Sequence, residues 1–137
     1  MRGSVYPNAC TNKQKEEMRR TLDGKINKPS QAFKLIETLL CERPDKSAIA
    51  HLRKSMPRQL RVRTESTGQK PESEIVAVDM KLARRLLADG NAWDVSIHGD
   101  GPTLALQYFA NEACVKGVTF NYVKSTWMIH EISEACD

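Results

Sequence analysis

The chain has 137 residues, 40% of them apolar and 28% charged, and a formal net charge of +4. This apolar content excludes wholesale disorder, and the longest apolar run is only a few residues, so no membrane span is expected. The charge is uneven, because residues 1–63 hold 15 Lys and Arg against 6 Asp and Glu, whereas residues 64–137 hold 6 against 11. Such polarity favours oriented encounter with a charged partner, although solvated helices commonly carry Lys and Arg as well.

The first third of the chain predicts three helices, at residues 12–23, 30–41 and 46–56. Each has apolar residues at helical spacing and a capping residue at its start. Glycine and proline provide the ends, since glycine suits the last turn of a helix and proline cannot continue one. The predicted caps are Thr11, Ser30 and Asp45, and the predicted ends lie at Gly24, Pro44 and Pro57.

From residue 58 on, apolar and polar residues alternate with the period of two that is typical of strands. Strands are predicted at residues 60–65, 74–78, 93–98, 104–108, 115–123 and 126–133, with Trp93, Val95 and Ile97 in the core. A helix capped by Asp79 separates the second and third strands. Short connections between successive strands imply antiparallel pairing. We therefore predict a single α+β domain over residues 1–137, with a helical segment at 1–57 and a mainly antiparallel sheet of about five or six strands at 58–137 that includes the inserted helix.

The four cysteines predict two disulfides. A hairpin that turns at Lys124-Ser125 places Cys114 opposite residue 135, so a one-residue bulge, or a turn one residue longer, would bring Cys114 and Cys136 together. The first two helices should pack antiparallel, which brings Cys10 beside Cys41. Persistent disulfides imply an oxidising compartment. The alternative is four reduced, buried cysteines in a cytosolic protein.

The predicted compartment is the periplasm or the exterior, with this chain as a mature form, because its N-terminus lacks the profile of a signal peptide. The absence of any Asn-x-Ser/Thr acceptor favours the bacterial periplasm. No metal site is predicted, because no two cysteines have the spacing of a zinc knuckle and His51, His98 and His130 are scattered. No cofactor is expected.

Three sets of residues resemble functional sites. Asp94, Ser96 and His98 have the composition of a hydrolytic triad, but residues two apart on a strand are predicted to stand too far apart for a hydrogen bond. His130 and Glu131 would serve as an acid/base pair only if they shared a face, and adjacent strand residues point to opposite faces. A basic run that would suit a phosphate backbone comprises His51, Arg53, Lys54, Arg58, Arg61 and Arg63.

The loops at residues 64–73 and 99–103 are the most plausible recognition elements, because polar loops on a rigid sheet commonly carry binding function. Together with the charged residues near them they give a set of predicted partner-binding residues. These are Arg58, Arg61, Arg63, Glu65, Lys70, Asp94, His98 and Asp100.

The order of elements resembles the cone-shaped NTF2-like superfamily. The ending Val118-Thr119-Phe120-Asn121-Tyr122, followed by Trp127-Met128-Ile129-His130-Glu131-Ile132, is similar to the last hairpin of its bacterial extracytoplasmic members. The resemblance implies a curved sheet around a pocket that is catalytic in some members and only a binding surface in others. Members with acid/base activity use an Asp and a His inside the cone, whereas Asp94 and His98 are predicted to face outward.

We therefore predict a periplasmic or secreted protein without catalytic activity that binds another protein. In its more specific form, it is an inhibitor or immunity protein that occludes a toxic or cell-wall-degrading enzyme. A homodimer through a sheet face is also possible. The alternatives are a small-molecule-binding protein or acid/base enzyme with an NTF2-like pocket, and nucleic-acid binding through residues 51–63, which the acidic C-terminal half disfavours.

Overall fold

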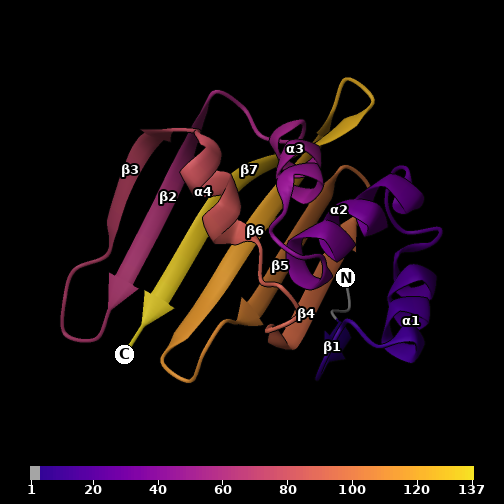
Figure 1. The fold of residues 1–137 in the computed structure, drawn as a ribbon, viewed down its shortest axis with the longest axis horizontal. Coiled ribbons are helices and arrows are strands. Elements are labelled where there is room, and N and C mark those ends of the chain that lie inside the picture. Colours follow the sequence, from indigo (N-terminus) through magenta and orange to yellow (C-terminus); the bar gives the residue numbers. More distant parts are fainter. Residues whose placement is uncertain (1–3) are drawn as a thin grey trace.

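The computed structural model describes residues 4–137 and has an α+β fold, as predicted. Helices lie on one face of a curved sheet that does not close into a barrel (Figure 1). The sheet has seven strands, and the helices are four in number among the described residues. In chain order the elements are β1 (Ser4–Tyr6), α1 (Asn12–Leu22), α2 (Pro29–Cys41), α3 (Lys46–Arg53), β2 (Gln59–Ser66), β3 (Glu72–Ala77), α4 (Met80–Leu86), β4 (Trp93–Asp100), β5 (Thr103–Phe109), β6 (Cys114–Val123) and β7 (Thr126–Cys136).

The strand order across the sheet is β1-β4-β5-β6-β7-β2-β3. All neighbours pair antiparallel except β2 and β7, which run parallel. The last strand in the chain is therefore flanked by β6 on one side and by β2 on the other. β1, which pairs with β4 over three residues, is the strand that the sequence pattern did not predict, because three residues are too few to show a period.

Two of the three predicted N-terminal caps are present. The side chains of Thr11 and Asp45 accept hydrogen bonds from the backbone N–H groups of Gln14 and Ala48. The prediction that Ser30 caps α2 is wrong, because the helix begins one residue earlier, at Pro29. Proline suits the first helical position, since its φ is already helical and it lacks an N–H that would have no acceptor there.

Helices and sheet enclose one cluster of buried apolar side chains. Trp127 lies at its centre, is fully buried, and donates its indole N–H to the carbonyl of Asn27 at 2.7 Å. The prediction that Trp93 joins this core is wrong, since its side chain is 55% exposed. The β4–β5 register shifts between Trp93 and Ser96, and Asp94 has a φ of 48°, so the alternation of faces breaks at the start of β4.

Both predicted disulfides are present. Cys10–Cys41 joins the segment before α1 to the end of α2, with the Cα atoms 5.5 Å apart. Cys114 and Cys136 are directly opposed on β6 and β7, with a Cα–Cα distance of 4.2 Å. Of the two predicted possibilities, the bulge supplies this alignment, because Phe120 pairs with Ile129 whereas Thr119 pairs with Glu131, which leaves His130 as the extra residue.

Candidate functional site

The sheet face opposite the helices is uncovered, and we call it the open face. Its side chains are exposed or half-buried, while the residues that alternate with them enter the core. Small residues occupy its middle, and two shallow hollows of about 270 and 190 Å³ lie along it. The open face includes Arg61, Arg63 and Glu65 of β2, Ser96, His98 and Asp100 of β4, Ala105, Gln107 and Phe109 of β5, Gly117 and Thr119 of β6, and His130, Glu131 and Ser133 of β7.

Five of the eight predicted partner-binding residues lie on the open face, in two groups separated by β5, β6 and β7. Arg61, Arg63 and Glu65 form the group on β2, and His98 and Asp100 form the group on β4. Gln107 and Glu131 also lie between these groups, but the side chains that line the two hollows there are mostly small, so the middle of the face is low. The face therefore has charged margins and a shallow centre.

The remaining three predicted residues lie at the edges of this surface. Arg58 is exposed in the connection before β2, Lys70 is exposed in the connection between β2 and β3, and Asp94 is exposed at the irregular start of β4. The structure therefore does not bring all eight residues into one compact site.

The arginines on β2 are held by neighbours. Arg61 donates a hydrogen bond to the hydroxyl of Ser73 at 2.8 Å, and Arg63 forms an ion pair with Glu131 at 3.4 Å. An exposed pair of this kind contributes less than about 1 kcal/mol to stability. Both guanidinium groups therefore remain free to exchange their present contacts for those of a bound molecule.

The predicted separation of Ser96 from His98 is wrong, because the Ser96 hydroxyl and His98 Nε2 lie 3.2 Å apart. Backbone spacing alone does not limit the distance, since the long imidazole side chain leans along the strand. A hydroxyl within reach of an imidazole is the first half of a nucleophile and base pair. Within residues 4–137, His98 has no carboxylate partner, and Asp94 makes only a backbone hydrogen bond to Pro7. The three residues therefore do not form a triad.

The predicted separation of His130 from Glu131 is also wrong. Ile129 and Ile132 both point into the core, so the two residues between them both face away from it. The bulge at His130 places the pair on the same face, because it inserts one residue into the alternation. That face is the open one, so neither side chain enters a pocket beneath the helices.

The basic run at residues 51–63 is divided between the two sides of the sheet. His51 belongs to α3 on the helix side, where its Nδ1 lies 2.8 Å from the hydroxyl of Thr38, and Arg53 donates to the carbonyl of Val78. Arg61 and Arg63 lie on the open face. The run does not form the continuous basic stripe that follows a phosphate backbone.

A pocket of about 420 Å³ lies on the helix side, between α4 and the sheet, and we call it the α4 pocket. Its apolar lining consists of Val62, Val76, Leu82, Leu86 and Ile132. Its charged lining consists of Glu74, Asp79, Lys81, Arg85, Lys116 and Glu134. Three acidic and three basic groups thus surround an apolar floor. The sequence did not reveal these lining residues, because they come from four strands and a helix that share no motif.

The charges at the inner end of the α4 pocket are linked. The ammonium of Lys116 lies 3.9 Å from the carboxylate of Glu134 and donates to the carbonyl of Arg85 at 3.5 Å. Burial and the negative charge of Glu134 raise the pKa of Tyr108 to about 12. This tyrosine therefore stays protonated at neutral pH.

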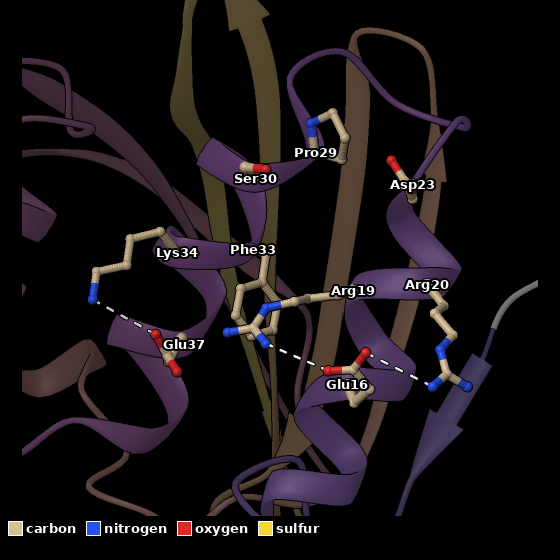
Figure 2. Close-up of a pocket in the computed structure, with 9 residues that line it drawn as sticks. All are labelled: Glu16, Arg19, Arg20, Asp23, Pro29, Ser30, Phe33, Lys34 and Glu37. Atoms are coloured by element: carbon tan, nitrogen blue, oxygen red, sulfur yellow. Dashed lines mark ion pairs between the residues drawn. The ribbon is translucent and has the colours of Figure 1, made fainter.

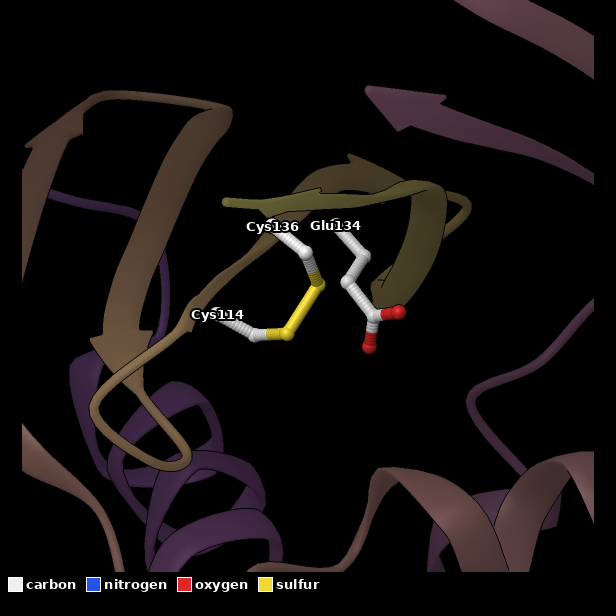
Figure 3. A group of neighbouring side chains, drawn as sticks. All are labelled: Cys114, Glu134 and Cys136. Atoms are coloured by element: carbon white, nitrogen blue, oxygen red, sulfur yellow. A yellow bond between two sulfur atoms is a disulfide. The ribbon is translucent and has the colours of Figure 1, made fainter. Parts of the chain in front are cut away.

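Glu134 also adjoins the second disulfide (Figure 3). Ligand atoms of Cys114, Glu134 and Cys136 all lie within 4.8 Å of one another. The two sulfurs are bonded to each other, however, and the thiolate is the form of cysteine that binds a metal. In this state the group crosslinks β6 to β7.

A groove of about 580 Å³ runs between α1 and α2 (Figure 2). Except for Asp23, its charged residues form ion pairs. Arg19 lies over the ring of Phe33 at 4.4 Å and pairs with Glu16, and Lys34 pairs with Glu37. Burial disfavours ionisation of Glu37, but the ammonium groups of Lys15 and Lys34 outweigh it and lower the pKa of this carboxyl. Of these contacts, Arg19 over Phe33 and Lys15 with Glu37 join the two helices to each other.

No family model matches the chain, and no curated protein matches it. Solved structures that are similar to it include the following two. One is a DUF4783 family protein from Bacteroides fragilis YCH46, with a TM-score of 0.41, 14% identity, and coverage of 76% of this chain and 95% of that one. The other is an NTF2-like protein of unknown function from Shewanella baltica OS155, with a TM-score of 0.42, 10% identity, and coverage of 90% and 94%.

The arrangement of helices on a curved sheet is the one that the NTF2-like resemblance of the sequence implies. At these TM-scores the likenesses carry no argument about a site, a ligand or a partner. No helix among residues 4–137 is both long and apolar enough to cross a lipid bilayer.

Proposed function

We propose that the protein is an extracytoplasmic binding module that docks another protein on the open face. In its most specific form, it is an inhibitor or immunity protein that occludes the active site of a toxic or cell-wall-degrading enzyme. The observation that supports this most is the open face itself, with charged margins of both signs around a shallow centre of small residues. Charged margins steer association and set orientation, while a flat centre admits a large partner.

Two further observations fit a rigid module outside the cytosol. The disulfides close loops with sequence separations of 31 and 22, one in the helical part and one in the sheet, and such bonds persist in oxidising compartments. Within residues 4–137, the pairs Ser96–His98 and His130–Glu131 lie on an exposed surface rather than in a cleft that excludes water, and such a cleft is what acid/base catalysis commonly needs.

The test is affinity capture from a periplasmic extract with three immobilised proteins. These are the wild type, the open-face variant Arg61→Glu/Arg63→Glu, and the control variant Lys13→Glu/Arg20→Glu, which makes the same charge change on the exposed side of α1. We expect a protein that the wild type and control retain and the open-face variant loses. If that protein is an enzyme, adding the wild type in equal amount should abolish its activity. Equal retention by all three, or retention of nothing but a second copy of this chain, refutes the proposal.

A second candidate function is favoured by the α4 pocket. Its volume of about 420 Å³, apolar floor and convergent charges match the general features of small-molecule sites. The acid/base version with His130 or Glu131 has no support, because both face away from this pocket. Binding without catalysis is tested by a thermal-shift screen of metabolites with the wild type and Lys116→Met. A ligand that stabilises only the wild type would support this function.

A further inference from the structure

β3 forms one edge of the sheet, and nothing in the described part of the chain pairs with its outer side (Figure 1). The register shows which of its backbone groups are free. Val78 donates to the carbonyl of Arg58, and these two residues are directly opposed in the continuation of the β2–β3 ladder. In an antiparallel ladder, hydrogen-bonded pairs recur at every second residue. Glu72, Glu74 and Val76 therefore bond to β2.

It follows that Ser73, Ile75 and Ala77 direct their N–H and C=O groups toward the free edge. None of these groups forms a further backbone hydrogen bond within residues 4–137. A row of unpaired donors and acceptors at a sheet edge is a template for an added strand. The edge therefore has the free backbone N–H and C=O groups that strand addition requires.

The side chains of β3 indicate what kind of strand it would accept. Glu74 and Val76 line the α4 pocket, and by alternation Glu72 shares their side of the sheet. Neither glutamate has an ion-pair partner among the described residues. On the opposite side of the sheet, Ile75 is 52% exposed. β3 contains no Lys or Arg, so its edge is acidic, with Val76 as the apolar residue on one side and Ile75 and Ala77 on the other.

We propose that β3 binds an extended, basic segment of a partner protein by strand addition. The segment runs antiparallel to β3, with Lys or Arg opposite Glu72 and Glu74 and apolar residues opposite Ile75 and Val76. Opposite charges on directly opposed strand residues attract, and like charges repel. Its side chains opposite Glu74 and Val76 lie at the mouth of the α4 pocket, which gives side-chain specificity to a contact made mainly by the backbone.

The charges of β3 also argue against a second copy as the occupant. If β3 paired with its own copy, each glutamate would lie opposite an uncharged residue or another glutamate and would gain no counter-charge. Acidic residues on an edge discourage such pairing. The proposal of strand addition at β3 does not depend on docking at the open face, because β3 is an edge of the sheet. Either proposal can fail without the other.

Binding can be measured with a labelled synthetic peptide, Thr-Val-Ile-Arg-Thr-Arg, capped at both ends. In the proposed register its third and fifth residues hydrogen-bond to Ile75 and Ser73, and its two arginines oppose Glu74 and Glu72. Changing both arginines to glutamate should weaken binding about tenfold or more. N-methylation of the third and fifth residues should weaken it by a similar factor, whereas N-methylation of the second and fourth, whose N–H groups face away from β3, should weaken it much less.

Two protein variants test the site from the other side. Ile75→Pro removes an outward N–H while leaving the β2 ladder intact, and proline is tolerated at such edge positions. It should abolish binding of the arginine peptide. Glu72→Lys/Glu74→Lys should reverse the preference, so that the glutamate peptide binds about tenfold tighter than the arginine peptide. The charge-matched control, Glu112→Lys/Asp137→Lys, lies outside β3 and should change affinity less than about threefold. Circular dichroism establishes that each variant is folded.

The amide exchange rates of Ile75 and Ala77 give a direct readout, because strand addition should slow both by at least about tenfold in the presence of saturating peptide. The proposal is overturned if the arginine peptide does not bind, if the glutamate peptide binds the wild type equally well, or if the preference survives the charge reversal. It is also overturned if sedimentation shows a dimer in which these amides are already protected.

Discussion

Removing the Cys10–Cys41 disulfide tests the physical basis of the proposed compartment. The double substitution Cys10→Ala/Cys41→Ala opens a loop whose ends are 31 residues apart. The entropy that this loop gains in the unfolded chain corresponds to about 3.7 kcal/mol at 25 °C. The unfolding entropy of a chain of 137 residues is about 0.29 kcal/mol/K, so the melting temperature should fall by about 13 °C.

Urea unfolding followed by circular dichroism, with linear extrapolation to water, measures this loss. The matched variant Cys114→Ala/Cys136→Ala opens a loop with a separation of 22, so it should lose about 3.4 kcal/mol. Mass spectrometry of the wild type before and after reduction is the control for the presence of both disulfides, because complete reduction should add the mass of two hydrogen atoms per disulfide. Double variants within about 1 kcal/mol of the oxidised wild type would refute the view that the crosslinks hold this fold together.

Four more substitutions test the core and, as a comparison, the open face. Trp127→Phe removes the indole donor to the carbonyl of Asn27, an exposed residue that water can reach, so the lost hydrogen bond should lower the free energy of unfolding in urea by about 0.5–1.5 kcal/mol. Gly99→Ala would place a methyl group 2.6 Å from Ile26 Cγ2 in the core, so it should lower the free energy of unfolding by about 1–3 kcal/mol. Gly117→Ala on the open face meets only the Ser133 hydroxyl, which can rotate away, so it should lower the free energy of unfolding by less. Tyr108 keeps its proton up to a pKa of about 12 when folded and has an ordinary value of 10.0. The stabilisation that comes from keeping Tyr108 protonated is therefore complete below pH 10. It is lost as the pH rises from 10 to 12, at about 1.4 kcal/mol per pH unit. Over this range, the free energy of unfolding in urea should fall less steeply for Tyr108→Phe than for the wild type.

The elements that the sequence predicted well are those whose signals are local. Asp45 and Asp79 cap helices at the predicted positions, because a short polar side chain before an apolar repeat has few other uses. The turn at Lys124-Ser125 fixed the last hairpin, and its length limited the position of Cys136 to within one residue. Both disulfides followed from this kind of local geometry.

The features that the sequence missed depend on contacts between distant segments or on irregular backbone. The parallel pairing of β2 with β7 joins residues about 70 positions apart and has no local signature. The bulge that pairs Cys114 with Cys136 was expected, yet its position at His130 was not, so the faces assigned to His130 and Glu131 were wrong. The α4 pocket was missed for the same reason, since its charged groups converge only after β2, β3, β6 and β7 are assembled.

The position of β7 between β6 and β2 has a consequence for how the protein is made. β2 and β3 emerge early in synthesis, but their place in the sheet is beside a strand that is synthesised last. Until β7 is released, this early hairpin has no strand to join and exposes Leu60, which is buried in the finished protein. Completion of the sheet must therefore follow translation of residue 136, so β2 and β3 take their final place only after the rest of the sheet has been synthesised.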